Sequence, residues 1–330
     1  MREKLLFWVI VSILSISTIV ILLISGEISI ERKDPIKIGI TIWSGDAHAF
    51  LAQNKGIFEK NGVQIKLVFS EQYSEIEQKY RSGELDGIFT TLTDVIKLNI
   101  DGKDSQVIYV TDYSNDADVI VGSGALVSDL KGKTVSSEDT DGYSRIFVLK
   151  ALEKSGLSEN DVKFVNIPAH EVLSALERGE IDAGHTWEPT KSKAAAAGYS
   201  VLFSGGQIPG TITSTLAFNS EIIVKRPDDV MAIVKSMVEA QEYRDTNWDE
   251  SMAIMADAEG LTVIEMSSGF AGMNTLDLVE NKFAFTKSNS TESLYQSGAY
   301  IIDYYKKIGK LTNHTIDNAV EPKFIHNLAK

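Results

Sequence analysis

The sequence has no cysteine among its 330 residues. This absence excludes disulfide bonds, metal sites built from thiolates and a cysteine nucleophile. It also excludes the lipid-modified cysteine that would tether a bacterial lipoprotein to its membrane. Any attachment to a membrane must therefore come from another feature of the chain.

Positive charge is also scarce. The chain carries 32 lysine and arginine residues against 46 aspartate and glutamate residues, which gives a formal net charge of −14. Nucleic acids and anionic lipids are bound by clustered lysine and arginine. We therefore expect no nucleic-acid partner for a chain as acidic as this one.

Motifs for catalysis and cofactor binding are missing as well. We find no Ser-His-Asp order, no glycine-rich phosphate loop and no zinc-ligand spacing. His48, His170 and His185 are not spaced as metal ligands. The sequence therefore favours a protein that is not an enzyme and that uses no metal and no cofactor.

The first 29 residues contain a long apolar run. Residues 5–26 carry no charged side chain, and Arg2 and Lys4 precede them. At about 1.5 Å per residue, this run spans a hydrocarbon core about 30 Å thick, and the positive-inside rule places the rest of the chain outside the cytoplasm. We expect a single membrane anchor over 1–29 with the folded part on the extracytoplasmic side. A cleaved signal peptide, whose apolar region is usually shorter, is the alternative, and the protein would then be secreted.

The rest of the chain alternates short apolar strands with amphipathic helices. We predict strands over 37–42, 63–69, 86–89 and 106–112, with helices over 47–60, 71–81 and 91–100 between them, and the pattern starts again with strands over 133–136, 162–167 and 181–186. Strands that alternate with helices of this length predict βαβ units and largely parallel sheets. The chain has 330 residues, of which 43% are hydrophobic, so it is long enough and apolar enough for two such α/β lobes.

Two turns in the chain are closely similar. Residues 82–87 read SGELDG and residues 178–183 read RGEIDA, and in both a helix ends at a glycine just before a strand. Two lobes of the same topology would produce this repeat, although such turns are common. After Ser204 the pattern changes to a β-rich run over 211–218 and then to helices over 227–246, 250–259, 263–269 and 290–308. We expect this helical C-terminal part to pack back on the first lobe.

Four segments, in order along the chain, carry a family resemblance. They are KGIFEKNGV at 55–63, DLKGKTV at 129–135, GLSENDV at 156–162, and GEIDA at 179–183 followed by WEP at 187–189. Each resembles a motif of bacterial solute-binding proteins. The chain is similar to the ABC-importer family that binds nitrate, sulfonate, taurine and bicarbonate, which also has a thiamine-pyrimidine synthase branch. The resemblance runs from about residue 36 to the C-terminus.

The resemblance implies a two-lobed, periplasmic-binding-protein-like clamp of type 2. Lobe 1 would be discontinuous, over 30–112 and 217–330, and lobe 2 would span 113–216. The implied role is the extracytoplasmic solute-binding component of an ABC importer, with a permease and an ATPase as partners. A ligand-sensing domain of a membrane receptor is one alternative. The enzyme branch is another, but by resemblance it needs a histidine donor in the cleft and a cysteine-rich segment.

Ligands of doubly wound sheets lie beyond the carboxyl ends of the strands, at the N-termini of the following helices. Five predicted strands end in polar or aromatic residues, and we expect these ends to converge on one cleft. The candidate ligand-binding residues are Trp43, Ser44, Gly45, Thr90, Thr91, Asp112, Ser114, Glu138, Tyr143, Ser144, Trp187 and Glu188. The tryptophans have a second interpretation as core residues, the hydroxyl residues as helix caps, and the acids as solvated charges. Asp94, Asp116 and Asp118 are expected at the surface or in the hinge.

No lysine or arginine stands at the five strand ends, and Arg145 is the nearest one. A sulfonate or nitrate site usually gains from such a residue. We therefore expect a neutral or amine-bearing ligand, such as a pyrimidine-like or amino compound. Trp43, Tyr143 and Trp187 would sandwich a planar ring or cover a cation.

Overall fold

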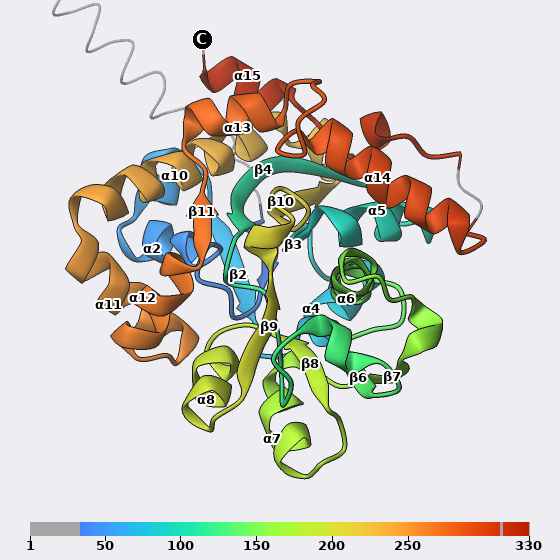
Figure 1. The fold of residues 1–330 in the computed structure, drawn as a ribbon. Coiled ribbons are helices and arrows are strands. Elements are labelled where there is room, and N and C mark those ends of the chain that lie inside the picture. The colour runs from blue at the N-terminus through green and yellow to red at the C-terminus, as the bar shows by residue number, and fades with distance from the viewer. Residues whose placement is uncertain (1–33, 311–312, 330) are drawn as a thin grey trace, which may run out of the picture. The chain divides into compact units, whose positions relative to one another are not determined.

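Two separate β-sheets organise the chain (Figure 1). The structure is a computed structural model that describes residues 34–310 and 313–329. The anchor expected over 1–29 lies outside these residues. Within them, no helix is both long enough and apolar enough to cross a membrane.

The first sheet has six strands in the order β11-β4-β10-β3-β1-β2. The first three strands of the chain run parallel, whereas β10 is antiparallel to both β3 and β4, and β11 is antiparallel to β4. The strands are β1 (Ile36–Ile40), β2 (Ile65–Phe69), β3 (Gly87–Thr91), β4 (Ser105–Ser114), β10 (Thr213–Asn219) and β11 (Met273–Thr275). Four of the five residues of β1 are buried, as is typical of a parallel strand with helices on both faces.

The second sheet has five strands in the order β7-β6-β8-β5-β9. The two pairs formed by β6 with β7 and β8 are parallel, and β5 is antiparallel to β8 and β9. The strands are β5 (Val119–Gly122), β6 (Thr134–Ser137), β7 (Lys163–Asn166), β8 (Ala183–Thr186) and β9 (Ser200–Ser204). Its apolar side chains form a core of their own, separate from the core of the first sheet.

The two sheets share one plan, and the repeated turn marks it. Both have their first three parallel strands in the order second, first, third, followed by an antiparallel strand. Asp86 accepts a hydrogen bond from the Lys37 N–H on β1 at 2.8 Å, and Asp182 accepts one from the Thr134 N–H on β6 at 2.9 Å. The two turns therefore occupy equivalent positions, and each aspartate ties the start of the third strand to the first.

Helices flank the sheets, and most of them belong to the six-stranded one. Figure 1 shows α2 and α10 on one side of that sheet and α5 and α14 on the other. The helices are α2 (His48–Asn54), α3 (Ile57–Lys60), α4 (Tyr73–Ser82), α5 (Leu92–Ile100), α6 (Tyr143–Lys154), α7 (Val172–Glu177), α8 (Thr190–Ala196), α9 (Ser220–Lys225), α10 (Pro227–Thr246), α11 (Trp248–Glu259), α12 (Val263–Ala271), α13 (Leu278–Ala284), α14 (Leu294–Lys307) and α15 (Lys323–Leu328).

The expected two-sheet α/β fold with a helical C-terminal part is confirmed. The single helix expected over 47–60 is wrong in detail, because Gly56 has a φ of 66° and divides it into α2 and α3. The sequence prediction also missed β5, β11 and α13, which are short. The chain leaves the six-stranded sheet after β4 and returns to it at β10. The lobe boundaries at 112/113 and 216/217 stay a prediction.

One buried amide completes the edge of β4. Asn281 on α13 is fully buried, its Oδ1 accepts the Val110 N–H at 2.9 Å, and its Nδ2 donates to the Val110 carbonyl at 3.0 Å. The pairing of β11 with β4 covers only residues 112–114. The Asn281 side chain therefore takes the place of a strand neighbour at Val110.

We expect Asn281→Ala to lower the free energy of unfolding by about 1–3 kcal/mol, because it leaves two buried backbone groups without partners. Denaturant unfolding of the variant and of Asn274→Ala would measure this. Asn274 lies nearby on β11 but is exposed, so its replacement should cost little. Equal effects of the two substitutions would contradict this role.

Candidate functional site

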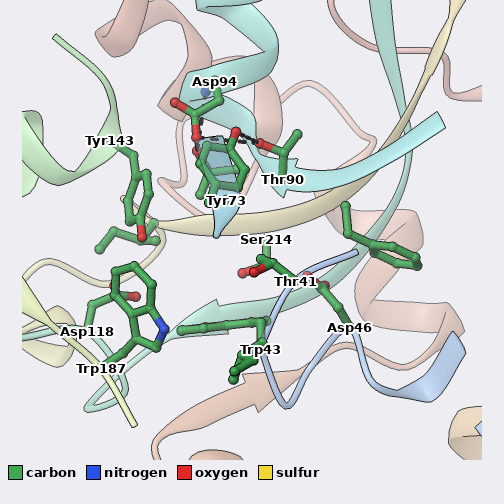
Figure 2. Close-up of a pocket in the computed structure, with 14 residues that line it drawn as sticks. Thr41, Trp43, Asp46, Tyr73, Thr90, Asp94, Asp118, Tyr143, Trp187 and Ser214 are labelled. Atoms are coloured by element: carbon green, nitrogen blue, oxygen red, sulfur yellow. Dashed lines mark hydrogen bonds between the residues drawn. The ribbon is translucent and has the colours of Figure 1, made fainter. Parts of the chain in front are cut away.

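A cavity lies where the carboxyl ends of the parallel strands of both sheets meet (Figure 2). Residues that follow β1 and end β3 line it from the six-stranded sheet. Residues just before β5, at the start of α6 and just after β8 line it from the other side. The lining residues are Thr41, Ile42, Trp43, Asp46, Tyr73, Phe89, Thr90, Thr91, Asp94, Asp118, Tyr143, Trp187, Ile212 and Ser214.

Aromatic rings form much of the wall. The ring centroids of Trp43 and Trp187 are 6.4 Å apart with the ring planes at 76°, and those of Tyr143 and Trp187 are 6.2 Å apart at 41°. The two indoles are thus in edge-to-face contact across the boundary between the sheets. No planar ring fits between them in this conformation, and the role of these rings toward a ligand stays a prediction.

Trp43 is held in place by buried acids. Its indole N–H donates to Asp112 Oδ2 at 2.8 Å, and its backbone N–H donates to Glu259 Oε1 at 3.3 Å. Asp112 is fully buried and also accepts hydrogen bonds from Thr111 and Ser214, at 2.9 and 3.1 Å. Asp112 therefore positions the wall of the cavity from behind.

A buried histidine supports the same loop. His48 donates from Nδ1 to the Gly45 carbonyl at 2.7 Å, and its Nε2 lies 3.1 Å from Arg244 Nη1, which donates to it. Burial, followed by the charge of Arg244, lowers the pKa of His48 to about 3. The ring is therefore neutral at any physiological pH and acts as a fixed link between the loop and α10.

Asp94 enters the cavity from the first turn of α5. Its backbone N–H donates to Thr91 Oγ1 at 3.2 Å, and the Thr91 hydroxyl donates to Asp94 Oδ2 at 2.9 Å. Thr91 is the N-cap of this helix. Tyr73 and Thr90 are joined by a hydrogen bond between their hydroxyls beside the same carboxyl (Figure 2).

Asp118 enters from the opposite side and is held by a chain of hydrogen bonds. The Glu138 N–H donates to Ser144 Oγ at 2.9 Å, and Ser144 Oγ lies 2.8 Å from His185 Nδ1. With its ring proton on Nε2, His185 accepts from Ser144 and donates to Asp118 Oδ1 at 2.9 Å. Ser114 Oγ accepts the backbone N–H of Asp118 at 2.9 Å. Asp118 is 1% exposed, and its second oxygen, Oδ2, has no hydrogen-bond partner among the described residues.

Burial raises the pKa of the acids around the cavity. The pKa rises to about 7 for Asp94 and Asp112 and to about 8 for Glu138 and Glu259. The pKa of Asp46 is also raised well above its usual range, first by burial and then by the charge of Asp112. Many of these carboxyls are therefore protonated near neutral pH in the free protein.

The structure brings five of the predicted site residues to this cavity, namely Trp43, Thr90, Thr91, Tyr143 and Trp187. Asp112, Ser114 and Ser144 lie behind the wall, where they hold Trp43, Asp118 and His185. Gly45 has a packing role, since a Cβ there would lie 2.0 Å from Asp112 Oδ2. Ser44, Glu138 and Glu188 line two smaller hollows that share Trp187 with the cavity.

Other lining residues were not among the predicted ones. Asp94 was expected at the surface or in the hinge, and this is wrong, because it lies on α5, is 3% exposed and lines the cavity. Asp118 lies in the segment that joins β4 to β5, where a crossing between the lobes was expected, but it is not at the surface, since it is 1% exposed and lines the cavity. Asp46, Tyr73 and Ser214 were not predicted. Among the described residues, no three acidic or histidine side chains are placed to hold a metal ion.

Glu259 gives the protein a pH-dependent stability that can be tested. It is 3% exposed, and its Oε2 has no hydrogen-bond partner among the described residues. Below its usual pKa it is protonated in both the folded and the unfolded chain. As the pH rises toward about 8, the unfolded chain loses this proton while the folded chain retains it, so stability falls.

We expect Glu259→Gln to flatten this fall and to raise the free energy of unfolding at about pH 8 by roughly 1–2 kcal/mol. Thermal unfolding between about pH 5 and about pH 8 would measure it. Glu242→Gln, at an exposed position on α10, is the matched control and should follow the wild type. Parallel curves for Glu259→Gln and the wild type would show that Glu259 does not cause the dependence.

Comparisons with known proteins agree with this architecture. A family model described as the NMT1-like family matches residues 30–258. A candidate binding protein of Brucella abortus is 25% identical over 238 residues, which are 70% of this chain and 73% of that protein. The taurine-binding periplasmic protein of Escherichia coli is 26% identical over 171 residues, 50% of this chain and 51% of that one.

A solved structure has the same fold. The periplasmic aliphatic sulphonate binding protein SsuA from Escherichia coli superposes with a TM-score of 0.71 at 19% identity, and the match covers 89% of this chain and 100% of that one. The likeness supports the two-sheet architecture described above. Because the family model matches well over half of the sequence, the chain belongs to the NMT1-like family.

Proposed function

We propose that this chain is the extracytoplasmic solute-binding component of an ABC importer, and that it captures a small polar molecule by closing two lobes around it. The observation that carries the proposal is the cavity, because side chains from both sheets line it. A ligand there touches both lobes at once. The site would consist of the lining residues, with Asp112, Ser114 and Ser144 as supports.

Contacts across the boundary between the sheets support a closed conformation. Asp141, in the loop between β6 and α6, pairs with Lys97 of α5 at 2.9 Å and with Lys310, and its carbonyl accepts the Tyr305 hydroxyl of α14 at 2.8 Å. On another side, Lys193 of α8 pairs with Glu265 of α12 at 3.4 Å. Figure 1 shows α8 and α12 next to each other. These contacts would break if the lobes separated.

The mechanism follows from these two groups of contacts. The lobes would rotate about the segments that join β4 to β5 and β9 to β10. In the open form the ligand contacts one lobe, and in the closed form it contacts both, so it stabilises the closed form by its differential affinity. A permease that recognises the closed shape would then receive loaded protein only.

The extracytoplasmic location is part of the proposal. The taurine-binding protein and SsuA are named as periplasmic binding proteins. In this chain, residues 1–29 would anchor the clamp and raise its concentration beside the transporter. The lobes would be 30–112 with 217–330, and 113–216.

The geometry supports a solute-binding protein better than an enzyme. Ser144, His185 and Asp118 do form a hydrogen-bonded series, but Ser144 and His185 are fully buried. Ser144 is also not among the residues that line the cavity. A nucleophile must reach its substrate, so we assign this series to holding Asp118 in position.

Closure can be measured with spin labels. The chain has no cysteine, so Ala196→Cys on α8 and Ile264→Cys on α12, both exposed, provide two unique labelling sites. Nitrate, taurine, sulfonates, amines and pyrimidines would be added one at a time. We expect the label-to-label distance to shorten when the added solute is a ligand of the protein. Trp187→Ala should abolish the change, whereas Trp248→Ala, at an exposed tryptophan on α11, should not. A distance distribution that no solute changes would argue against a clamp.

The importer role needs a separate test, because a receptor domain would close in the same way. We expect the ligand-loaded chain to stimulate ATP hydrolysis several-fold by the reconstituted permease and ATPase encoded beside its gene. Closure without any stimulation, together with activation of a membrane kinase, would favour the sensor alternative instead.

A further inference from the structure

The charge of the cavity points to the class of ligand. Its described lining includes three aspartates, Asp46, Asp94 and Asp118, and no lysine or arginine. Two cations on the helices that reach the cavity, α5 and α6, are engaged elsewhere. Lys97 pairs with Asp141, and Arg145 pairs with Glu159 while it lies 3.2 Å from the centre of the Phe164 ring.

One carboxyl oxygen in this lining has no partner. His185 fixes Asp118 through Oδ1, and Oδ2 has no donor among the described residues. An unpaired buried carboxyl oxygen is costly unless a donor or a positive charge reaches it. The hydrogen-bond series that begins at the Glu138 N–H ends at this side chain and holds it in the wall.

We propose that the cavity binds a small organic cation with at least one N–H bond, with its nitrogen at Asp118 Oδ2 and its surface against the rings of Trp43, Tyr143 and Trp187. This inference rests on the proposed solute-binding function and names the chemical class of the solute. It excludes anions as the preferred ligand.

Each part of the ligand follows from a different feature of the wall. Positive charge matches the three carboxyls and the faces of the aromatic rings, which attract cations. A hydrogen-bond donor is required to satisfy Asp118 Oδ2, and the N–H bonds of an ammonium group supply it at the same atom as the positive charge. A quaternary ammonium without a hydroxyl fits the rings but leaves this oxygen unpaired. A sulfonate or nitrate would enter among three acids with no positive partner.

The same arrangement links the cation to closure. Asp94 belongs to α5 beside the six-stranded sheet, and Asp118 directly precedes β5 of the other sheet. Closing the lobes places Asp94 and Asp118 in the lining of one cavity, which is unfavourable unless the carboxyls are protonated or a cation is present. A bound ammonium group would therefore remove a cost of closing and would contact both lobes.

Isothermal titration calorimetry of the full chain with four probes of similar size tests this. The probes are propylammonium, propyltrimethylammonium, 1-propanol and propanesulfonate, all at millimolar concentration. We expect propylammonium to bind, propyltrimethylammonium to bind at least about tenfold more weakly because it lacks an N–H donor, and the neutral and anionic probes to give no saturable heat.

Two variants locate the nitrogen. We expect Asp118→Asn to weaken propylammonium binding by at least about tenfold with little change in the melting temperature, since the amide retains the shape and can still accept from His185. Asp116→Asn removes the same charge two residues away at an exposed position and should bind propylammonium as the wild type does.

Each contrary result would overturn a different part of the proposed ligand assignment. Propanesulfonate binding as tightly as propylammonium, or no binding of propylammonium, would overturn the cation. Equal binding of propyltrimethylammonium would overturn the N–H requirement, and unchanged binding by Asp118→Asn would overturn the assigned carboxylate. If any other solute still closes the spin-labelled clamp, the solute-binding function survives all of these results.

Discussion

Asp112 is the residue on which the site depends. It lies on β4, where the chain is about to leave the six-stranded sheet, and it accepts hydrogen bonds from the Trp43 indole and from Ser214 on β10, where the chain returns. One buried carboxyl thus joins both connecting strands to a wall of the cavity. If the lobes rotate about these strands, Trp43 moves together with the six-stranded sheet, because Asp112 ties it to β4. The position of the wall and the position of the hinge are therefore set by the same interactions.

The site is built from buried acids whose carboxyl oxygens have only some of the hydrogen-bond donors that they could accept from. Asp112 has three donors, Asp94 has the threonines at the start of α5, and Asp118 has His185 on one oxygen. Burial raises the pKa of Asp94 and Asp112 to about 7, so protonation removes part of the charge. The lobes can close when these acids are protonated, because neutral carboxyls do not repel each other. A positively charged ligand would allow the lobes to close with the acids ionised.

The sequence predicted the fold better than it predicted the site. Alternating strands and helices, with glycines at the ends of helices, indicated the two sheets, because these signals are local. The rule that ligands lie at the carboxyl ends of strands identified Trp43, Thr90, Thr91, Tyr143 and Trp187. It works because parallel strands present these ends at one edge of each sheet.

The residues that were missed depend on features that the sequence does not mark. Asp94 lies in the first turn of α5, three residues after the N-cap Thr91, so only the rotation of α5 about its axis decides that it reaches the cavity. Asp118 precedes β5, whose residues VIVG favour a strand but are only four in number, too few to show a period. Ser214 lies on an antiparallel strand, whose beginning rather than its end meets the site. Conversely, Gly45 and Ser144 lie in the correct segments but behind the wall.

The repeated turn explains why the site is asymmetric. Asp86 and Asp182 perform the same structural task in the two sheets, and both lie at the amino ends of their strands, away from the cavity. The shared plan therefore fixes how the strand ends face each other, while the residues placed at those ends are free to differ. The six-stranded sheet contributes Trp43 after its first strand, and the five-stranded sheet contributes Trp187 after its third. These positions are not equivalent, so no symmetry relates the two indoles, which meet edge to face, and the cavity that they help to close has Asp94 on one side and Asp118 on the other.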